Sequence, residues 1–299
     1  MNDGSALAIR FSIVLSSTLL IASCAGMGMQ ARPAANWTAA APPSELSAPG
    51  AQWIKVDARD GHKLLAAVFR PQGAGPFPAV VVMHGSAGLQ RTQIELGAEL
   101  AREGFVAVVG CWQLIASPPA RVPNPVCAEA TPQAAWEADP AGNSGKELVA
   151  AARSLPYVQP DRVGLYGVSR GGNAVLWAGS TGAEVRAIVA DAPAHVATRV
   201  TPTPPSTQSV LAGLSAPTLI LHGTADRAVP VQQSRQYDEA ARAMGKPVTV
   251  VYYEGMGHQV TLPHAGTESP ALAEMRRKTQ GDARRRAIEF LRERLVTKL

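Results

Sequence analysis

The stretch Gly167-Val168-Ser169-Arg170-Gly171 decides the fold, because it joins a predicted strand to a predicted helix. The apolar run at residues 163–166 precedes it, and a helical pattern begins at about Gly171. A serine at such a turn adopts a strained conformation, and glycines two positions to either side let the backbone pass closely. The turn places the hydroxyl at a helix N-terminus, where free N–H groups favour developing negative charge. Ser169 is therefore the candidate nucleophile.

The chain around this turn alternates strands and helices. The two first strands are joined by Asp60-Gly61, a hairpin signal. Predicted strands occupy residues 53–58, 63–70, 78–83, 105–109, 163–166, 185–190, 217–221 and 248–253, and predicted helices occupy about 94–104, 231–244 and 283–295 besides the one from 171. This order predicts an α/β fold, a doubly wound and mostly parallel sheet with an N-terminal antiparallel hairpin. Chemistry is expected at the carboxyl ends of the strands.

A serine nucleophile needs a base and an acid, and loops after later strands supply both. His258 follows the last predicted strand in a glycine-bearing loop, and His264 is its rival. Asp226 follows the strand at 217–221 and can fix the tautomer of the base, while Asp191 is the alternative acid. The chain order Ser, Asp, His is the one that this fold uses.

Acyl transfer also requires hydrogen-bond donors for an oxyanion. One donor is predicted to be the backbone N–H of Arg170. The loop after residues 78–83 supplies the other, from the N–H of Ser86 with Ala87 as the alternative. His84 and His222, each just before a glycine at a strand end, are interpreted as packed histidines without a catalytic role.

These motifs together resemble the α/β-hydrolase superfamily and, within it, esterases similar to dienelactone hydrolase. The resemblance runs from about Gln52 to the C-terminus and rests on residues 84–88, 167–172, 221–226 and 257–258. It implies a serine esterase that cleaves carboxylic esters without a cofactor. Dienelactone hydrolases proper carry a cysteine nucleophile where this chain has Ser169, so the family name implies fold and general chemistry rather than lactone hydrolysis. A peptidase or acyltransferase with the same triad, and a binding protein whose catalysis has lapsed, remain the alternatives.

Two predicted insertions, at about residues 111–144 and 193–215, follow strands and should overhang the site. Trp112 and Arg170 are candidates to line a pocket for a small or medium ester, although Trp112 could instead pack in the core. Cys111 and Cys127 could close the first insertion with a disulfide, which export would permit, or stay free.

The N-terminus is predicted to be a targeting segment, residues 1–24. Arg10 precedes an apolar run at residues 11–22, shorter than the ~20 residues of a membrane-spanning helix and typical of a secretory signal. Ile21-Ala22-Ser23-Cys24 resembles the lipobox of bacterial lipoproteins, in which the cysteine is lipidated; an ordinary cleaved signal is the alternative. Residues 25–50, rich in Ala and Pro, are expected to be a flexible linker, and residues 51–299 the catalytic domain. An exported, membrane-anchored protein of the periplasm or outer surface is expected.

The net charge and the distribution of basic residues give little support for a nucleic-acid partner. The net charge of the 299-residue chain is +5, which is mild for its size. The basic residues Arg276, Arg277, Lys278 and 284–286 could form a nucleic-acid patch, but a solvated helix face is the simpler interpretation, so no nucleic-acid partner is expected. No motif for a metal or a dinucleotide is present.

Overall fold

The computed structural model describes residues 1, 32–59, 61, 63–112, 143–195, 205–263 and 270–296. Its centre is a nine-stranded sheet in the order β1-β2-β3-β5-β4-β6-β7-β8-β9. The strands are β1 (Trp37–Ala40), β2 (Ala51–Asp57), β3 (Lys63–Phe69), β4 (Phe77–Met83), β5 (Val106–Gly110), β6 (Val158–Val168), β7 (Ala187–Asp191), β8 (Thr218–Gly223) and β9 (Val248–Tyr253). The helices are η1 (Ser44–Leu46), α1 (Arg91–Arg102), α3 (Asn143–Ser154), α4 (Arg170–Ser180), α5 (Thr207–Gly213), α6 (Gln232–Ala243) and α7 (Pro270–Leu295).

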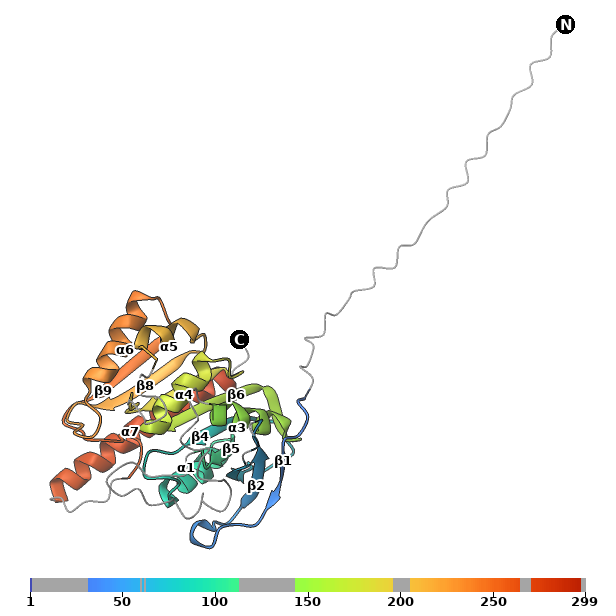
Figure 1. The fold of residues 1–299 in the computed structure, drawn as a ribbon, viewed down its shortest axis with the longest axis horizontal. Helices are drawn as coiled ribbons and strands as arrows, with labels where there is room; N and C mark the ends of the chain where they lie inside the picture. Colours follow the sequence, from blue (N-terminus) through green and yellow to red (C-terminus); the bar gives the residue numbers. More distant parts are fainter. Residues whose placement is uncertain are drawn as a thin grey trace.

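The sheet is antiparallel at one end and parallel elsewhere. The pairs β1·β2, β2·β3 and β3·β5 are antiparallel, whereas β5, β4, β6, β7, β8 and β9 run parallel to one another. Figure 1 shows β1 and β2 at one end of the molecule and β8 and β9 at the other. The predicted α/β-hydrolase fold with an N-terminal antiparallel hairpin is confirmed.

Helices cover both faces of the sheet. The central strands carry apolar side chains on both sides, and without the helices these side chains would be exposed to solvent. α1 and α7 bury their apolar residues against one face, together with Tyr166 and Val189 of the sheet. α3, α4, α5 and α6 cover the opposite face, against Leu165 and Ile188. Burial on both faces fixes the positions of the strand ends, and the candidate site lies at these ends.

The predicted linker at residues 25–50 is wrong in its second half. β1 begins at Trp37 and pairs with β2 at the edge of the sheet, and Leu46 of η1 is buried in the core. The indole N–H of Trp37 also donates to Ser154 Oγ at 2.8 Å. An Ala- and Pro-rich segment without periodicity can still form a strand when an open sheet edge supplies its hydrogen bonds.

The last helix is longer than predicted, since α7 begins at Pro270 rather than at about 283. Its first turns are largely exposed, so they carry no apolar periodicity that would reveal a helix. The predicted signal at residues 1–24 and Cys24 lie outside the described residues, apart from Met1. Within the described part of the chain, no helix is both long and apolar enough to span a membrane.

Candidate active site

The nucleophile candidate Ser169 occupies a strained turn between β6 and α4. Its backbone has φ 57° and ψ −118°, a left-handed conformation that costs a non-glycine residue roughly 1–3 kcal/mol. Its N–H donates to the carbonyl of Asp191 at 2.7 Å, which ties the turn to the end of β7. A Cβ on Gly171 would lie 2.3 Å from the carbonyl oxygen of Met83, so only glycine lets α4 start this close to β4. The strain that the sequence predicted at Ser169 is present.

Asp226 and His258 are brought together by the loops after β8 and β9. The Nδ1 atom of His258 lies 2.6 Å from Oδ2 of Asp226, and the Asp226 side chain is fully buried. Its other oxygen, Oδ1, accepts the N–H groups of Ala228 and Val229, both at 2.8 Å. Burial by itself would raise the pKa of Asp226, but hydrogen bonds from His222, His258 and Val229 outweigh it and hold that pKa well below its ordinary value. Asp226 is therefore an ionised acceptor for His258.

The alternative acid, Asp191, holds the same loop at a different point. Its carboxylate accepts the N–H groups of Val260 and Thr261 at 3.1 and 2.8 Å and the Thr261 hydroxyl at 2.6 Å. Burial raises the pKa of Asp191, and these three hydrogen bonds act against the rise. The geometry thus pairs Asp226 rather than Asp191 with His258, and gives Asp191 the task of anchoring the segment after the histidine.

The early loop, which is residues 84–88 after β4, lies next to Ser169 and to the loop that carries His258. A Cβ built on Gly85 would lie 3.2 Å from Cβ of Ser169 and 3.5 Å from Nε2 of Gln259, the residue after His258. Gln259 also has a positive φ of 62°, which turns the chain sharply there. Three segments distant in sequence, carrying Gly85, Ser169 and Gln259, therefore meet at the carboxyl edge of the sheet.

Each predicted oxyanion donor is adjacent in sequence to a residue of this meeting point. Ser86 follows Gly85 and is half-buried, and Ala87 is exposed. The Gly88 N–H donates to the Gly85 carbonyl at 3.1 Å, closing the turn that contains both. Arg170 is the first residue of α4, where an N–H has no intrahelical acceptor, and burial lowers the pKa of its half-buried side chain.

Trp112, a candidate to line the substrate pocket, is buried with a 7% exposed fraction. Its indole N–H donates to the carbonyl of His84 at 2.8 Å, and its backbone N–H lies 3.4 Å from Nε2 of His84. Nδ1 of His84 is 2.8 Å from the Gly85 carbonyl, so this nitrogen carries the hydrogen. Burial lowers the pKa of His84 to about 4. These contacts favour the packing alternative, in which Trp112 supports the early loop through its bonds to His84.

The remaining histidines have different partners. The backbone N–H of His195 donates to Gln233, and its ring packs near Trp177 and Tyr237 with centroid separations of 6.4 Å in each case. His264 lies outside the described residues. His222, interpreted from sequence as a packed residue, is fully buried, and it also contacts the carboxylate of Asp226, with Nε2 3.2 Å from Oδ2. Its four-residue spacing from Asp226 in one turn was the signal that could have indicated this contact.

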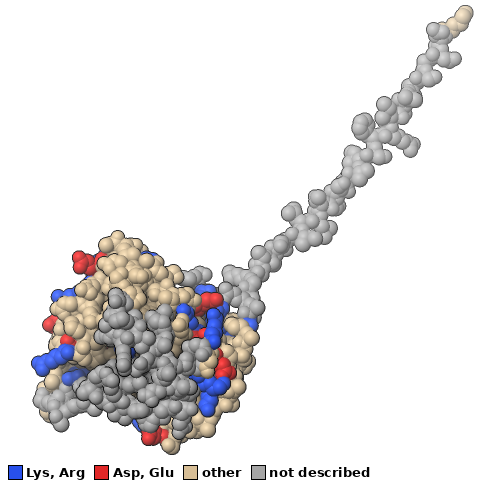
Figure 2. Space-filling view, viewed as in Figure 1, with Lys and Arg blue, Asp and Glu red and all other residues tan. Residues whose placement is uncertain are grey.

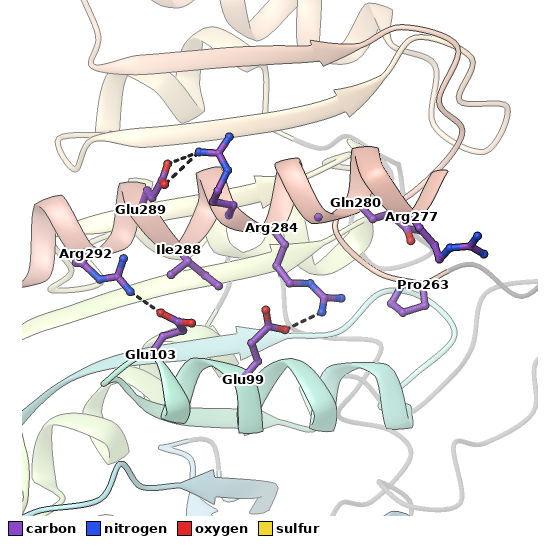
Figure 3. Close-up of a pocket in the computed structure, with 11 residues that line it drawn as sticks. Glu99, Glu103, Pro263, Arg277, Gln280, Arg284, Ile288, Glu289 and Arg292 are labelled. Atoms are coloured by element: carbon purple, nitrogen blue, oxygen red, sulfur yellow. Dashed lines mark hydrogen bonds and ion pairs between the residues drawn. The ribbon is translucent and has the colours of Figure 1, made fainter. Parts of the chain in front are cut away.

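Helix α7 contacts the histidine loop, which is the segment after β9 that carries His258 and runs to Leu262. Sequence reasoning missed this role of α7. Arg284 donates to the carbonyl of Thr261 through Nε at 3.1 Å and Nη2 at 2.9 Å, and to Glu99 of α1 at 2.6 Å. Gln280 donates to the carbonyl of Leu262 at 2.6 Å. Figure 3 shows Arg284 reaching from α7 toward Glu99 across a groove of about 410 Å³ between the two helices.

The basic stretch is therefore not one uniform solvated face. Arg277, Arg285 and Arg286 are exposed and pair with acidic residues of α7, whereas Arg284 is turned inward. On the face seen in Figure 2, basic and acidic side chains of the described residues lie interspersed.

Cys111 directly follows β5, is fully buried and takes part in a disulfide bond. Its predicted partner Cys127 lies outside the described residues, as does Cys24, so the pairing stays a prediction. In the described ranges, no group of three or more His, Cys, Asp and Glu side chains is arranged to hold a metal ion.

A serine at a strained strand-to-helix turn and a histidine bonded to an ionised aspartate, both on loops at the carboxyl edge of the sheet, are the groups that nucleophilic attack on a carbonyl requires. With the sheet order described above, these features define an enzyme of the α/β-hydrolase superfamily. The family model described as "Dienelactone hydrolase family" matches residues 64–295, and the chain belongs to that family. It is a hydrolase of the carboxylic-ester class.

Similar proteins agree with this assignment. A protein of Methylorubrum extorquens named as a candidate carboxymethylenebutenolidase is 26% identical over 219 residues, which are 69% of this chain and 70% of that protein. The crystal structure of a candidate dienelactone hydrolase from Klebsiella pneumoniae superposes with a TM-score of 0.64 at 21% identity, covering 81% of this chain and 97% of that one. Thermogutta terrifontis esterase 2 phosphorylated by paraoxon superposes with a TM-score of 0.59 at 20% identity, covering 84% and 98%. At such identities the two structures support the fold alone.

Proposed function

We propose that this protein is a serine esterase that cleaves small or medium carboxylic esters through a Ser169–His258–Asp226 triad and an acyl-enzyme. The observation that carries the proposal is the 2.6 Å contact between His258 Nδ1 and Asp226 Oδ2. Because an ionised carboxylate only accepts hydrogen bonds, Nδ1 carries the hydrogen and Nε2 is left to accept a proton. A histidine in this tautomer can act as the base for Ser169.

The reaction then has two halves. Ser169 Oγ attacks the ester carbonyl while its proton passes to Nε2 of His258, and the backbone N–H groups of Arg170 and Ser86 (or Ala87) hold the oxyanion. His258 returns the proton to the leaving alcohol, which departs and leaves an acyl group on Ser169. A water molecule, deprotonated by His258, attacks the acyl-enzyme; the bond to Oγ breaks, His258 passes the proton to Ser169, and the carboxylic acid is released. Each oxyanion donor contributes ~10²–10³ in kcat.

The test is hydrolysis of a panel of p-nitrophenyl esters of increasing acyl length, with a lactone and a p-nitroanilide alongside. Ser169→Ala and His258→Ala should each lower kcat/KM on esters by at least about 10³-fold. The matched control is Ser154→Ala, which removes another buried serine hydroxyl, bonded to Trp37 and Ala151, on α3. Ester hydrolysis that survives Ser169→Ala would contradict the mechanism, and faster cleavage of the anilide would favour a peptidase.

Covalent labelling provides a test independent of substrate choice. Paraoxon, which phosphorylates Thermogutta terrifontis esterase 2, should add its diethylphosphoryl group to Ser169 and release p-nitrophenol. Intact mass spectrometry should show one adduct in the wild type and none in Ser169→Ala. An adduct at another serine would overturn the assignment of the nucleophile.

We also propose that the enzyme is exported and held at a membrane by a lipid on Cys24. Support comes from the apolar run at residues 11–22 and the small residues before Cys24. Cys24→Ser should release the protein from the membrane fraction without loss of esterase activity. Retention of that variant in the membrane would contradict lipidation.

A further inference from the structure

His222 occupies the penultimate position of β8, four residues before Asp226, and is fully buried. Each of its ring nitrogens has a partner from a different element. Nε2 lies 3.0 Å from the carbonyl oxygen of Val229 and 3.2 Å from Oδ2 of Asp226, while Nδ1 lies 2.6 Å from the hydroxyl of Ser234 on α6. A buried imidazole with this many polar contacts is held in one orientation.

The partners fix which nitrogen carries the hydrogen in a neutral His222. The carbonyl of Val229 can only accept, so Nε2 must be the donor and Nδ1 the acceptor. The Ser234 hydroxyl therefore donates to Nδ1. Ser234 is itself fully buried, so no solvent competes for this hydroxyl.

Oδ2 of Asp226 accepts the N–H of His258 at 2.6 Å and lies 3.2 Å from Nε2 of His222, whose hydrogen it shares with the carbonyl of Val229 at 3.0 Å. Its Oδ1 is occupied by two backbone N–H groups. Every acceptor direction of this buried carboxylate is thus used, and three of its four donors belong to its own loop or to β8. Besides His258, His222 is the side chain that contacts Oδ2, so it can restrain this oxygen.

We propose that His222 and Ser234 form a positioning pair, in which Ser234 fixes the His222 tautomer and His222 restrains Oδ2 of Asp226 for its bond to His258. The inference rests on the proposed triad. His222 does not touch substrate, so it acts through Asp226. Its N–H also shares the carboxylate oxygen that accepts from His258.

Two consequences separate this role from simple packing. Removing the His222 N–H should lower kcat more than it changes KM, because the orientation of the base matters in the transition state. It should also move the acid limb of the pH profile of kcat/KM to higher pH, since Oδ2 then interacts only with His258 and stabilises its protonated form. Loss of packing alone would reduce the folded fraction without moving that limb.

The experiment compares His222→Leu, which removes the donor, with His222→Gln, whose amide N–H can replace Nε2–H, and with Ser234→Ala. His222→Leu should lower kcat about 10–100-fold, by analogy with the loss seen when the hydrogen-bond partner of a metal-binding histidine is removed. His222→Gln should recover most of this loss, and Ser234→Ala should lie between them. Ser154→Ala is again the matched control for loss of a buried hydroxyl, with kcat and the pH profile unchanged.

A second readout does not depend on activity. The Nδ1 proton of His258, observed by ¹H NMR as a far-downfield resonance in the wild type, should move further downfield in Ser234→Ala and His222→Leu, because Oδ2 loses or weakens its competing donor. An unchanged resonance and an unchanged pH profile in both variants would overturn the proposal. If Ser169→Ala retained esterase activity while this resonance still moved, the triad mechanism would fail and the His222–Asp226 coupling would stand.

Discussion

The hydroxyl of Thr261 donates to the carboxylate of Asp191 at 2.6 Å, three residues beyond His258. The backbone carbonyl of the same Asp191 accepts the N–H of Ser169 at 2.7 Å. One residue at the end of β7 therefore holds the nucleophile through its main chain and the histidine loop through its side chain. The relative position of Ser169 and His258 depends on Asp191, although Asp191 is not bonded to either ring nitrogen of the base.

Thr261→Val should loosen the histidine loop while keeping the shape of the side chain. A hydrogen bond to a buried carboxylate contributes about 1.5–3 kcal/mol to the free energy of unfolding, and its loss here should also lower kcat several-fold. Thr218→Val is the matched control, since the buried Thr218 hydroxyl donates to the carbonyl of Ala216 away from the site. Chemical denaturation and steady-state kinetics would check both. Equal kcat in the two variants would show that the Asp191 contact does not position the loop.

Gly85→Ala should impair catalysis by steric contact alone. The added Cβ would lie 3.2 Å from Cβ of Ser169 and 3.4 Å from the carbonyl oxygen of Val168, so the early loop must shift by a few tenths of an ångström. Because oxyanion donors must be placed closely, we expect kcat to fall at least about tenfold. Gly257→Ala, beside His258, has nothing within 4 Å of its Cβ and should retain activity. If Gly85→Ala were as active as Gly257→Ala, Gly85 would not border the oxyanion site.

Trp112→Phe should destabilise the protein by removing one hydrogen bond under the early loop. The carbonyl of His84 would lose the indole N–H at 2.8 Å, a cost of about 1–3 kcal/mol for a buried acceptor. Trp53→Phe is the comparison, because the buried indole nitrogen of Trp53 has no hydrogen-bond partner among the residues that the structure describes. The difference between the two free energies of unfolding isolates the hydrogen bond from the loss of ring volume. A zero difference would contradict a supporting role for Trp112.

The catalytic candidates could be predicted from sequence because each belongs to a short local pattern. Gly167 to Gly171 specifies the turn at Ser169, and the apolar runs of β4 to β9 specify a sheet whose carboxyl ends meet. The order of the loops then limits the partners of Ser169 to a few residues. What remained open, the choice between Asp226 and Asp191, depends on hydrogen bonds that sequence order does not contain.

The missed features all depend on contacts between distant elements. β1 forms because β2 leaves a free edge, not because residues 37–40 favour a strand. The orientation of His222 beside Asp226 depends on Ser234, which α6 brings to the other ring nitrogen of His222. Arg284 looks like its exposed neighbours in the sequence, and only the packing of α7 on one face of the sheet turns it toward Thr261.

Arg284→Gln and Arg285→Gln should differ although the residues are adjacent. Arg284 donates to Thr261 and Glu99 and is partly buried, so its loss should lower the free energy of unfolding by about 1–3 kcal/mol and reduce kcat. Arg285 pairs with Asp282 and Glu289 on the exposed side of α7, where ion pairs contribute about 0–1 kcal/mol. Thermal unfolding and esterase assays of the two variants would check this. Equal effects would mean that α7 does not hold the histidine loop.

His84 should make the stability of the protein depend on pH in a defined window. Burial lowers its pKa from 6.5 to about 4, so between these values the unfolded chain binds a proton that the folded protein does not. The contribution to stability is present above pH 6.5 and is lost as the pH falls toward 4, by about 3 kcal/mol in total. His84→Asn keeps a donor near Nδ1 but cannot titrate. Urea unfolding of both proteins from pH 7.5 to 4.5 should show the advantage of the wild type shrinking as the pH falls, whereas parallel curves would mean that His84 is not held neutral by its burial beneath the early loop.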